Sequence, residues 1–384
     1  MIKPGYSLCH SCGRTSRGFY YRDNHGGAVA SLVYRDGSYM LEAANQSFQI
    51  EPRNWEREAF PPEQLRARVG TAENYTTMIR CCPHCREKVL SKHVGRVPIF
   101  VFAVIGATGS GKSSWMAALG TAALGPMKRV PYRFYVRPVL STADEGSIAA
   151  TVLEKTKGSD YSNYIEIVRR TTNEVVAMAY VLDFAGELYE NAAAHGDSPV
   201  ARILSGESGE GFERIDAAVV IEPAVPDALN NDMKNNEEVL RTLDAYPVLR
   251  KVPVAHILTF GDLLIQQEQS KASADSAYIP AVRKETFPTT VYTEQTYEVA
   301  KRHFLPERIC ERIQLQNYIA KKGTLGNWLE SWHENVQHVG HFLVQSCRHK
   351  GSGANDYTRQ FNVADPLVWL LTELKLFPLD VMEE

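Results

Sequence analysis

The chain has 384 residues, of which 44% are hydrophobic and 23% charged, and 42 Lys and Arg against 45 Asp and Glu give a net charge of -3. This composition excludes a chain that is disordered throughout, and the length suits about two packed domains. The longest apolar runs, 98–107 and 175–184, are about half of the roughly 20 residues that a membrane-spanning helix needs. The N-terminus has no apolar segment before a cleavage site, so we expect a cytoplasmic protein with no membrane span.

Cysteines form two pairs within the first 96 residues. Cys9 and Cys12 make one C-x-x-C pair, and Cys82 and Cys85 make the other. Each pair places two thiolates on one tight turn, and two such turns brought together make a tetrahedral sulfur site for Zn²⁺. We therefore predict a structural zinc site on these four cysteines, with Cys81 as the alternative to Cys82. Redox-active thiols are the other interpretation.

The chain between the two cysteine pairs is about seventy residues long, well beyond the usual spacing in a zinc ribbon, so it is an insertion. Tyr- and Val-rich runs at 18–22 and 28–40, separated by Gly and Asp, predict strands there. Residues 1–96 are thus expected to form a small zinc-ribbon domain with a β-rich insertion. They carry 14 Lys and Arg against 9 Asp and Glu. This balance permits a nucleic-acid or acidic protein partner, although a solvated surface is the favoured interpretation.

A glycine-rich loop follows a run at 99–105 that is typical of a buried strand. The loop consists of Gly106, Ala107, Thr108, Gly109, Ser110, Gly111, Lys112 and Ser113, and a helical segment begins at Ser114. This is the phosphate-binding pattern G-x-x-x-x-G-K-[ST] in its strand, loop and helix setting. The glycines let backbone N–H groups point at phosphate oxygens, and the helix N-terminus adds a positive end. Lys112 is expected to reach the β- and γ-phosphates, and Ser113 to bind Mg²⁺.

An acidic residue ends the next long apolar run. The run at 175–182 leads into Asp183, and Gly186 and Glu187 follow. An Asp at a strand end can hold Mg²⁺ through water, and a Gly three residues later can offer an N–H to the γ-phosphate, so that the loop senses hydrolysis. We therefore predict Lys112, Asp183 and Gly186 as catalytic residues, and the resemblance described next implies Glu187 as the fourth.

The order of strand, Asp-x-x-Gly and Glu resembles switch II of the Ras-like and translation-factor-related GTPases, with Asp183 and Gly186 at the matching positions. Glu187 stands where Ras-like members carry a water-orienting Gln. A Glu could orient or deprotonate water, or it could leave hydrolysis slow. The resemblance implies an α/β fold with a doubly wound P-loop sheet, and a switch driven by GTP and Mg²⁺.

Two later strand ends match the base-reading segments of that family in part. After apolar runs at 217–221 and 252–258, Thr259 and Asp262 fit [NT]-K-x-D, with Phe260 in place of the Lys. The resemblance implies that Asp262 binds guanine, and capping of the following helix is the alternative. A further run at 339–345 ends in Ser346 and Cys347, where these GTPases carry S-A-K next to the guanine oxygen.

Switch I would supply a Thr to Mg²⁺ and is expected between residues 139 and 172. Thr142 and Thr156 are the candidates, and Thr156 is preferred because Thr142 starts a capping-box spacing. Residues 263–338 exceed the connection of a minimal Ras-like domain, and their periodicity predicts a helical insertion with helices at 293–303, 306–321 and 324–338. The late histidines show no metal-binding spacing and are assigned no ligand role: His303, His333, His338, His341 and His349.

The last predicted helix has Asp365 as its cap and Pro366 at its first position, and it is expected to cover one face of the sheet. The ribbon, the D-x-x-G-E segment and this D-P-L-x-W-L-L tail together resemble the bacterial double-GTPase proteins. That resemblance implies a zinc ribbon at 1–96 followed by a GTPase domain at 97–384. It also implies an effector protein or a second GTPase as partner, in bacterial conflict or phage defence. The alternatives are a P-loop ATPase and a non-hydrolysing nucleotide-binding scaffold whose ribbon binds nucleic acid or protein.

Overall fold

The structure is a computed structural model. It describes residues 2–4, 6–10, 14–22, 28–35, 38–43, 46–50, 79–106, 109–122, 132–138, 161–169, 171–183, 215–224, 243–244, 247–261, 324–346, 348–349, 355–356 and 363–376. Within this part of the chain, no helix is both long and apolar enough to span a bilayer.

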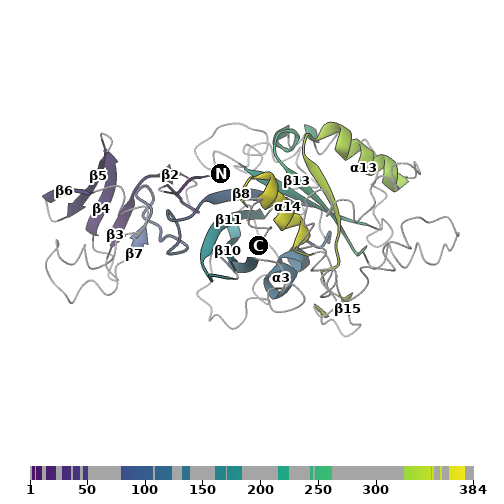
Figure 1. Ribbon diagram of the computed structural model, residues 1–384, viewed down its shortest axis with the longest axis horizontal. Helices are drawn as coiled ribbons and strands as arrows, with labels where there is room; N and C mark the ends of the chain where they lie inside the picture. The colour runs from purple at the N-terminus through teal and green to yellow at the C-terminus, as the bar shows by residue number, and fades with distance from the viewer. Residues whose placement is uncertain are drawn as a thin grey trace.

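A seven-stranded mixed sheet occupies the larger half of the molecule (Figure 1), with the strand order β14-β13-β12-β8-β11-β10-β9. Its members, in chain order, are β8 (Ile99–Ile105), β9 (Tyr132–Pro138), β10 (Tyr161–Arg169), β11 (Val175–Asp183), β12 (Ala217–Pro223), β13 (Val254–Thr259) and β14 (Val339–Leu343). The five strands from β14 to β11 run parallel, whereas β10 is antiparallel to both β11 and β9.

The parallel part of this sheet confirms the strands predicted from apolar runs. Every residue of β8, β12 and β13 is buried, which explains why these strands are mostly apolar and do not alternate, with Glu222, His256 and Thr259 as buried polar exceptions. The antiparallel strands β9 and β10 were not predicted. They follow α3 in the sequence and extend the sheet beyond β11, and a turn through Asn173, at φ +55°, joins β10 to β11.

Helices cover both faces of the sheet. Successive residues of a strand point to opposite faces. On β14, His341 meets the face on which Trp332 of α13 (Thr324–Asn335) packs, because both rings contact His256. Its neighbour Phe342 packs against Trp369 of α14 (Asp365–Glu373), with the ring centroids 5.8 Å apart. Helices α13 and α14 therefore lie on opposite faces, which confirms the doubly wound arrangement.

The third helix, α3 (Lys112–Ala122), contacts the segment that leads into α14. The indole Nε1 of Trp115 in α3 donates a hydrogen bond of 2.9 Å to the carbonyl oxygen of Val363. Trp115 is fully buried in the core. This bond joins the helix of the glycine-rich loop to the C-terminal part of the chain.

Two of the predicted helices, α13 and α14, are described, and each differs from the prediction at one end. Helix α13 ends at Asn335 and not at residue 338, because the carbonyl of His338 already accepts a hydrogen bond from Val254 in the neighbouring strand. In α14 the cap position is Ala364, which makes no side-chain capping bond, and Asp365 is the first helical residue. An acid in the first turn still favours the helix through its dipole. The helices predicted at 293–303 and 306–321 lie outside the described residues.

A second, five-stranded antiparallel sheet forms the opposite end of the molecule in Figure 1, in the order β6-β5-β4-β3-β7. Its strands are β3 (Phe19–Arg22), β4 (Ala28–Arg35), β5 (Ser38–Ala43), β6 (Gln46–Ile50) and β7 (Ile79–Cys81). A short hairpin of β1 (Ser7–Leu8) and β2 (Thr15–Ser16) precedes it. The strands predicted at 18–22 and 28–40 are present, the latter as the pair β4 and β5.

The described part of residues 1–96, called the N-terminal module below, is hydrogen-bonded directly to the large sheet. The backbones of Ile2 and Ile99 exchange two hydrogen bonds, of 2.6 and 2.9 Å. The hydroxyl of Tyr180 in β11 donates to the carbonyl of Leu8 at 3.0 Å, and burial raises the pKa of this phenol, so it keeps its proton. Leu8 also belongs to the same hydrophobic core as β8 and β11. The two parts thus share a packed, hydrogen-bonded junction.

Two short elements complete the described structure. A single 3₁₀ turn, η5 (Pro247–Arg250), precedes β13, and its Leu249 is fully buried. A two-residue ladder of β15 (Arg348–His349) and β16 (Asn355–Asp356) follows β14.

Candidate functional site

The glycine-rich loop joins the central strand β8 to α3, as the motif predicts. Gly106 follows the last residue of β8, and α3 begins at Lys112. Gly109 and Gly111 have φ angles of +79° and +97°, a left-handed region that only glycine enters without strain. Ala107 and Thr108 lie outside the described residues. The backbone conformation alone therefore favours glycine at these two positions of the loop.

The loop is packed closely against the ends of two neighbouring strands. A Cβ on Gly106 would lie 2.3 Å from the carbonyl oxygen of Ile221 in β12, and a Cβ on Gly111 would lie 3.2 Å from Cγ2 of Thr259 in β13. Any side chain at position 106 would displace backbone. The loop thus sits at the carboxyl ends of parallel strands, the edge where α/β sheets bind ligands.

Lys112 and Ser110 give this loop the chemistry of an anion site. The ammonium of Lys112 is buried and donates a hydrogen bond to the carbonyl oxygen of Gly106 at the other end of the loop. The hydroxyl of Ser110 is buried and has no hydrogen-bond partner among the described residues. The first turn of α3, which includes Ser113 and Ser114, contains no acidic residue. A cation, an unpaired hydroxyl and a helix N-terminus fit a phosphate group.

Asp183 lies at the same edge of the sheet. It is the last residue of β11, and in the parallel register its backbone pairs with Val104, close to the point where β8 enters the loop. The role of Asp183 beside the phosphates stays a prediction, because its side chain lies outside the described part of the chain. Gly186 and Glu187, which the sequence assigned to catalysis, lie outside the described residues.

Thr259 ends β13, and its side chain binds the phosphate loop itself. Its hydroxyl is 2.6 Å from the carbonyl oxygen of Ser110 and 3.2 Å from that of Glu222, and the residue is buried. The sequence placed Thr259 at the guanine base and missed this bond. The structure therefore adds a role for Thr259: it ties the phosphate loop to the ends of β12 and β13.

Two further predicted base-side segments are described in part. Phe260 has φ +57°, unusual for a residue with a side chain, and Gly261 then bonds the carbonyl of Val344 at 3.3 Å. Ser346, just beyond β14, has a buried hydroxyl with no partner in the described part of the chain. Asp262 and Cys347 lie outside the described residues. The observed segments thus reach the same edge as the loop.

The position of switch I is narrowed by the strands. Residues 161–169 form β10 and 171–174 belong to the turn into β11, so neither is a free loop. The rest of the expected window, residues 139–160 and 170, lies outside the described residues. Both candidates, Thr142 and Thr156, fall in it and lie outside the described residues.

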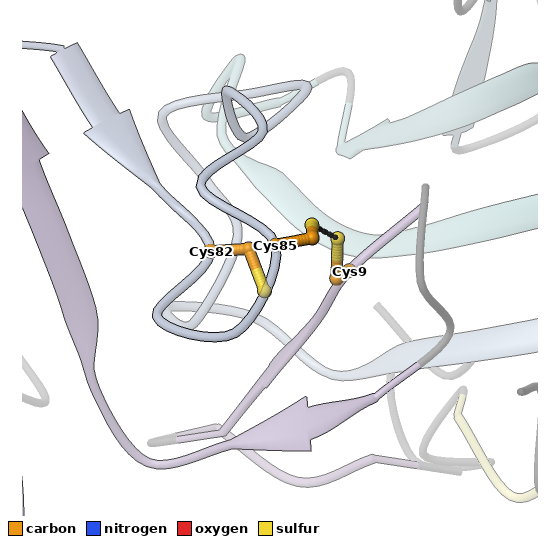
Figure 2. Close-up of side chains that lie close together, drawn as sticks. All are labelled: Cys9, Cys82 and Cys85. Carbon is orange, nitrogen blue, oxygen red and sulfur yellow. Dashed lines mark hydrogen bonds between the residues drawn. The ribbon is translucent and has the colours of Figure 1, made fainter. Parts of the chain in front are cut away.

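Three cysteines from the two ends of the N-terminal module converge, as Figure 2 shows. The Sγ atoms of Cys9, Cys82 and Cys85 all lie within 4.8 Å of one another, with 3.5 Å between those of Cys9 and Cys85. Cys81 is buried elsewhere and its thiol is directed to the carbonyl of Ile79, so Cys82 and not Cys81 joins the cluster. Cys12, the fourth predicted ligand, lies outside the described residues.

The turns that carry these cysteines have the backbone hydrogen bonds of tight ligand loops. The N–H of Cys82 bonds the carbonyl of Glu87, and the N–H of Arg86 bonds that of Cys82, with Arg86 at φ +67°. The N–H of His84 is 3.4 Å from the sulfur of Cys82, a contact that stabilises a thiolate. Three converging sulfurs with such support fit a soft divalent metal such as Zn²⁺.

Comparisons with known proteins give likeness of shape only. No protein-family model matches the chain, and no curated protein matches it in sequence. Among solved structures, the chain is similar to the signal recognition particle receptor SRb-GTP/SRX complex from Chaetomium thermophilum, with 12% identity, a TM-score of 0.30, and coverage of 72% of this chain and 98% of that one. It is also similar to sup35 complexed with GMPPNP, with 9% identity, a TM-score of 0.25, and coverage of 65% and 38% respectively.

Proposed function

We propose that this protein is a GTP-binding, Mg²⁺-dependent GTPase that acts as a molecular switch. The observation that carries the proposal is the loop between Gly106 and Lys112. It brings together a buried ammonium, an unpaired buried hydroxyl and a helix N-terminus at the carboxyl edge of a parallel sheet. Each of these groups favours a polyphosphate.

The residues divide the work as follows. On binding, Lys112 exchanges its bond to the Gly106 carbonyl for the β- and γ-phosphate oxygens, while backbone N–H groups of the loop and of α3 bind the rest of the phosphate chain. Ser113 and Asp183 hold Mg²⁺, which neutralises phosphate charge. Gly186 reads the γ-phosphate, and Glu187 orients the attacking water. The order of the 139–160 and 184–214 segments then reports the nucleotide state to a partner.

Guanine selectivity rests on the segments after β13 and β14. In this proposal Asp262 accepts hydrogen bonds from the base, Phe260 packs on its ring, and the backbone near Ser346 and Cys347 meets the guanine oxygen. Thr259 supports this region through the phosphate loop. The unpaired hydroxyl of Ser346 supplies a further polar group at the same edge.

We expect GTP to displace a fluorescent guanine nucleotide from the purified full chain with Mg²⁺ at a concentration at least about a hundredfold lower than ATP does, because a missed base contact leaves buried polar groups unpaired. Competition titrations in parallel, with phosphate release measured on the same samples, test this. Equal displacement by ATP would identify the site as that of an ATPase. Binding without turnover under every condition would favour a nucleotide-holding scaffold.

The same proposal includes a structural zinc site completed by Cys12, with the four thiolates closed to substrate. Three arginines of this module stack on aromatic rings, which supports a structural role for it: Arg17 on Tyr6, Arg80 on Phe19 and Arg86 on Tyr20. By the stated resemblance, we place the protein in the bacterial cytoplasm, in conflict or phage defence, with an effector protein or a second GTPase as partner.

Zinc content provides an independent prediction. We expect about one zinc per chain, measured by elemental analysis of protein purified without added metal, and its loss from the Cys9→Ser/Cys82→Ser double variant. Cys81→Ser is the matched control, since Cys81 is a neighbouring buried cysteine outside the cluster. Loss of zinc from the Cys81 variant, or its retention in the double variant, would contradict the assignment.

A further inference from the structure

A row of buried polar side chains crosses three strands beside the phosphate loop. His256 of β13 is in register with His341 of β14, and Glu222 of β12 lies on the same face of the sheet. Nε2 of His256 is 2.8 Å from Oε2 of Glu222, and Nδ1 of His256 is 2.8 Å from Nδ1 of His341. Both histidines are completely buried and Glu222 is 8% exposed. The three side chains form one continuous hydrogen-bonded row, the polar row.

The polar row ends at His341. Burial, followed by the nearby His256 and His333, holds the pKa of His341 well below its ordinary value, so this ring is neutral at neutral pH. One proton lies in the hydrogen bond between Nε2 of His256 and Oε2 of Glu222, and a single proton lies between the two Nδ1 atoms. The indole of Trp332 in α13 stacks on His256, with the centroids 5.0 Å apart. The row is thus held from β12 through β14 and from α13.

Glu222 connects the polar row to the phosphate loop through its own backbone. Its carbonyl oxygen accepts from the hydroxyl of Thr259, which also bonds the carbonyl of Ser110. The preceding carbonyl, that of Ile221, is the atom against which Gly106 is packed. Residues 221 and 222 therefore support both ends of the loop. Any shift of Glu222 moves the surface on which the loop rests.

Packing alone does not account for these residue types. A buried carboxylate and two buried imidazoles cost free energy of desolvation that apolar side chains of the same size avoid, and buried ionic groups are weak evidence for stability. Their bonds instead fix positions, because each hydrogen bond is directional. These bonds most directly fix the end of β12, which lies next to the phosphate loop.

We propose that His256 is a positioning residue for the nucleotide site: bonded to Glu222 and His341, it fixes the end of β12 and, through Thr259, the conformation of the phosphate loop. This inference rests on the proposed function for its ligand. It concerns the loop itself, however, so it can be tested with and without nucleotide.

The binding test compares two substitutions at one position in the full chain. His256→Leu removes both hydrogen bonds while it fills much of the space, and His256→Gln keeps an amide N–H that can reach Glu222. We expect His256→Leu to weaken binding of a fluorescent GTP analogue by about tenfold, and His256→Gln to restore it to within about threefold. Ile167→Ala, in buried β10 on the far side of β8, is the control for general loss of stability and should leave the affinity within about twofold.

The second test needs no ligand. Amide hydrogen exchange of residues 109–112 in nucleotide-free protein should accelerate by about tenfold in His256→Leu and stay unchanged in Ile167→Ala. Should His256→Leu not fold, Thr259→Val against Thr259→Ser tests the same connection, with loss expected in the first and recovery in the second. Wild-type affinity and exchange in His256→Leu would overturn the inference. Failure of the wild type to bind any nucleotide would overturn the proposed function, while the exchange comparison would still decide this one.

Discussion

Lys112→Ala is expected to weaken GTP binding by about a hundredfold while the protein stays folded. In the proposed complex the ammonium makes charge-assisted bonds to two phosphates, each worth about 1.5 to 3 kcal/mol, and loss of its existing bond to the Gly106 carbonyl on binding offsets part of this. A net loss of about 3 kcal/mol corresponds to roughly a hundredfold in the dissociation constant. Isothermal titration calorimetry in the presence of Mg²⁺ measures the dissociation constants of GTP and of GDP for the variant and the wild type.

The control for that experiment is Lys251→Ala, because Lys251 is exposed in the turn after η5. We expect it to bind both nucleotides as the wild type does. Lys112→Arg should not recover binding, since the guanidinium is larger than the ammonium that the loop encloses and Lys112 is only 9% exposed. Binding of GTP by Lys112→Ala within about threefold of the wild type would remove the phosphate loop from the mechanism.

The parts of the fold that the sequence predicts best are those whose signals are local. The run at 99–105 and the loop after it specify strand, loop and helix within about twenty consecutive residues, and β8 and α3 confirm that order. The buried strands β12 and β13 are also predictable, because a strand covered on both faces is mostly apolar, and Glu222, His256 and Thr259 are the polar exceptions here. Strands β9 and β10 were missed because neither is a continuous apolar run: in β9, Arg133 and Arg137 alternate with buried residues, as in a half-buried strand, and in β10 Glu166 interrupts the run.

The parts that could not be predicted depend on contacts between distant residues. The bond from Thr259 to Ser110 spans 149 positions, and a motif match can assign Thr259 to a base but cannot show that its hydroxyl binds the loop. His341 shows no ligand spacing in the sequence. Its significance appears only when β13 and β14 pair and bring it to His256, 85 positions away. The same holds for the choice of Cys82 over Cys81, which depends on the direction of one side chain at the end of β7.

Removal of zinc is expected to destabilise the large sheet as well as the N-terminal module. The cysteine cluster begins one residue after Leu8, whose carbonyl accepts the hydroxyl of Tyr180, and the backbone of Ile2 bonds β8 at Ile99. Loss of the metal frees this segment, since structural zinc supplies much of the folding free energy of its site. Tyr180 would then be a buried hydroxyl without its acceptor, at a cost of about 1 to 3 kcal/mol.

Together with the two backbone bonds at Ile99, the expected loss is about 3 kcal/mol, which lowers the melting temperature of a domain of this size by about 5 °C. Thermal unfolding with and without a chelator measures this shift in melting temperature. It is followed by the fluorescence of the buried tryptophans on the helices α3, α13 and α14. Tyr180→Phe should reduce the difference between the two curves, because it removes the bond to Leu8 in both states, and Cys81→Ser should leave the difference intact. If the chelator leaves the unfolding transition of the large sheet unchanged, residues 1–96 and 97–384 unfold as independent domains.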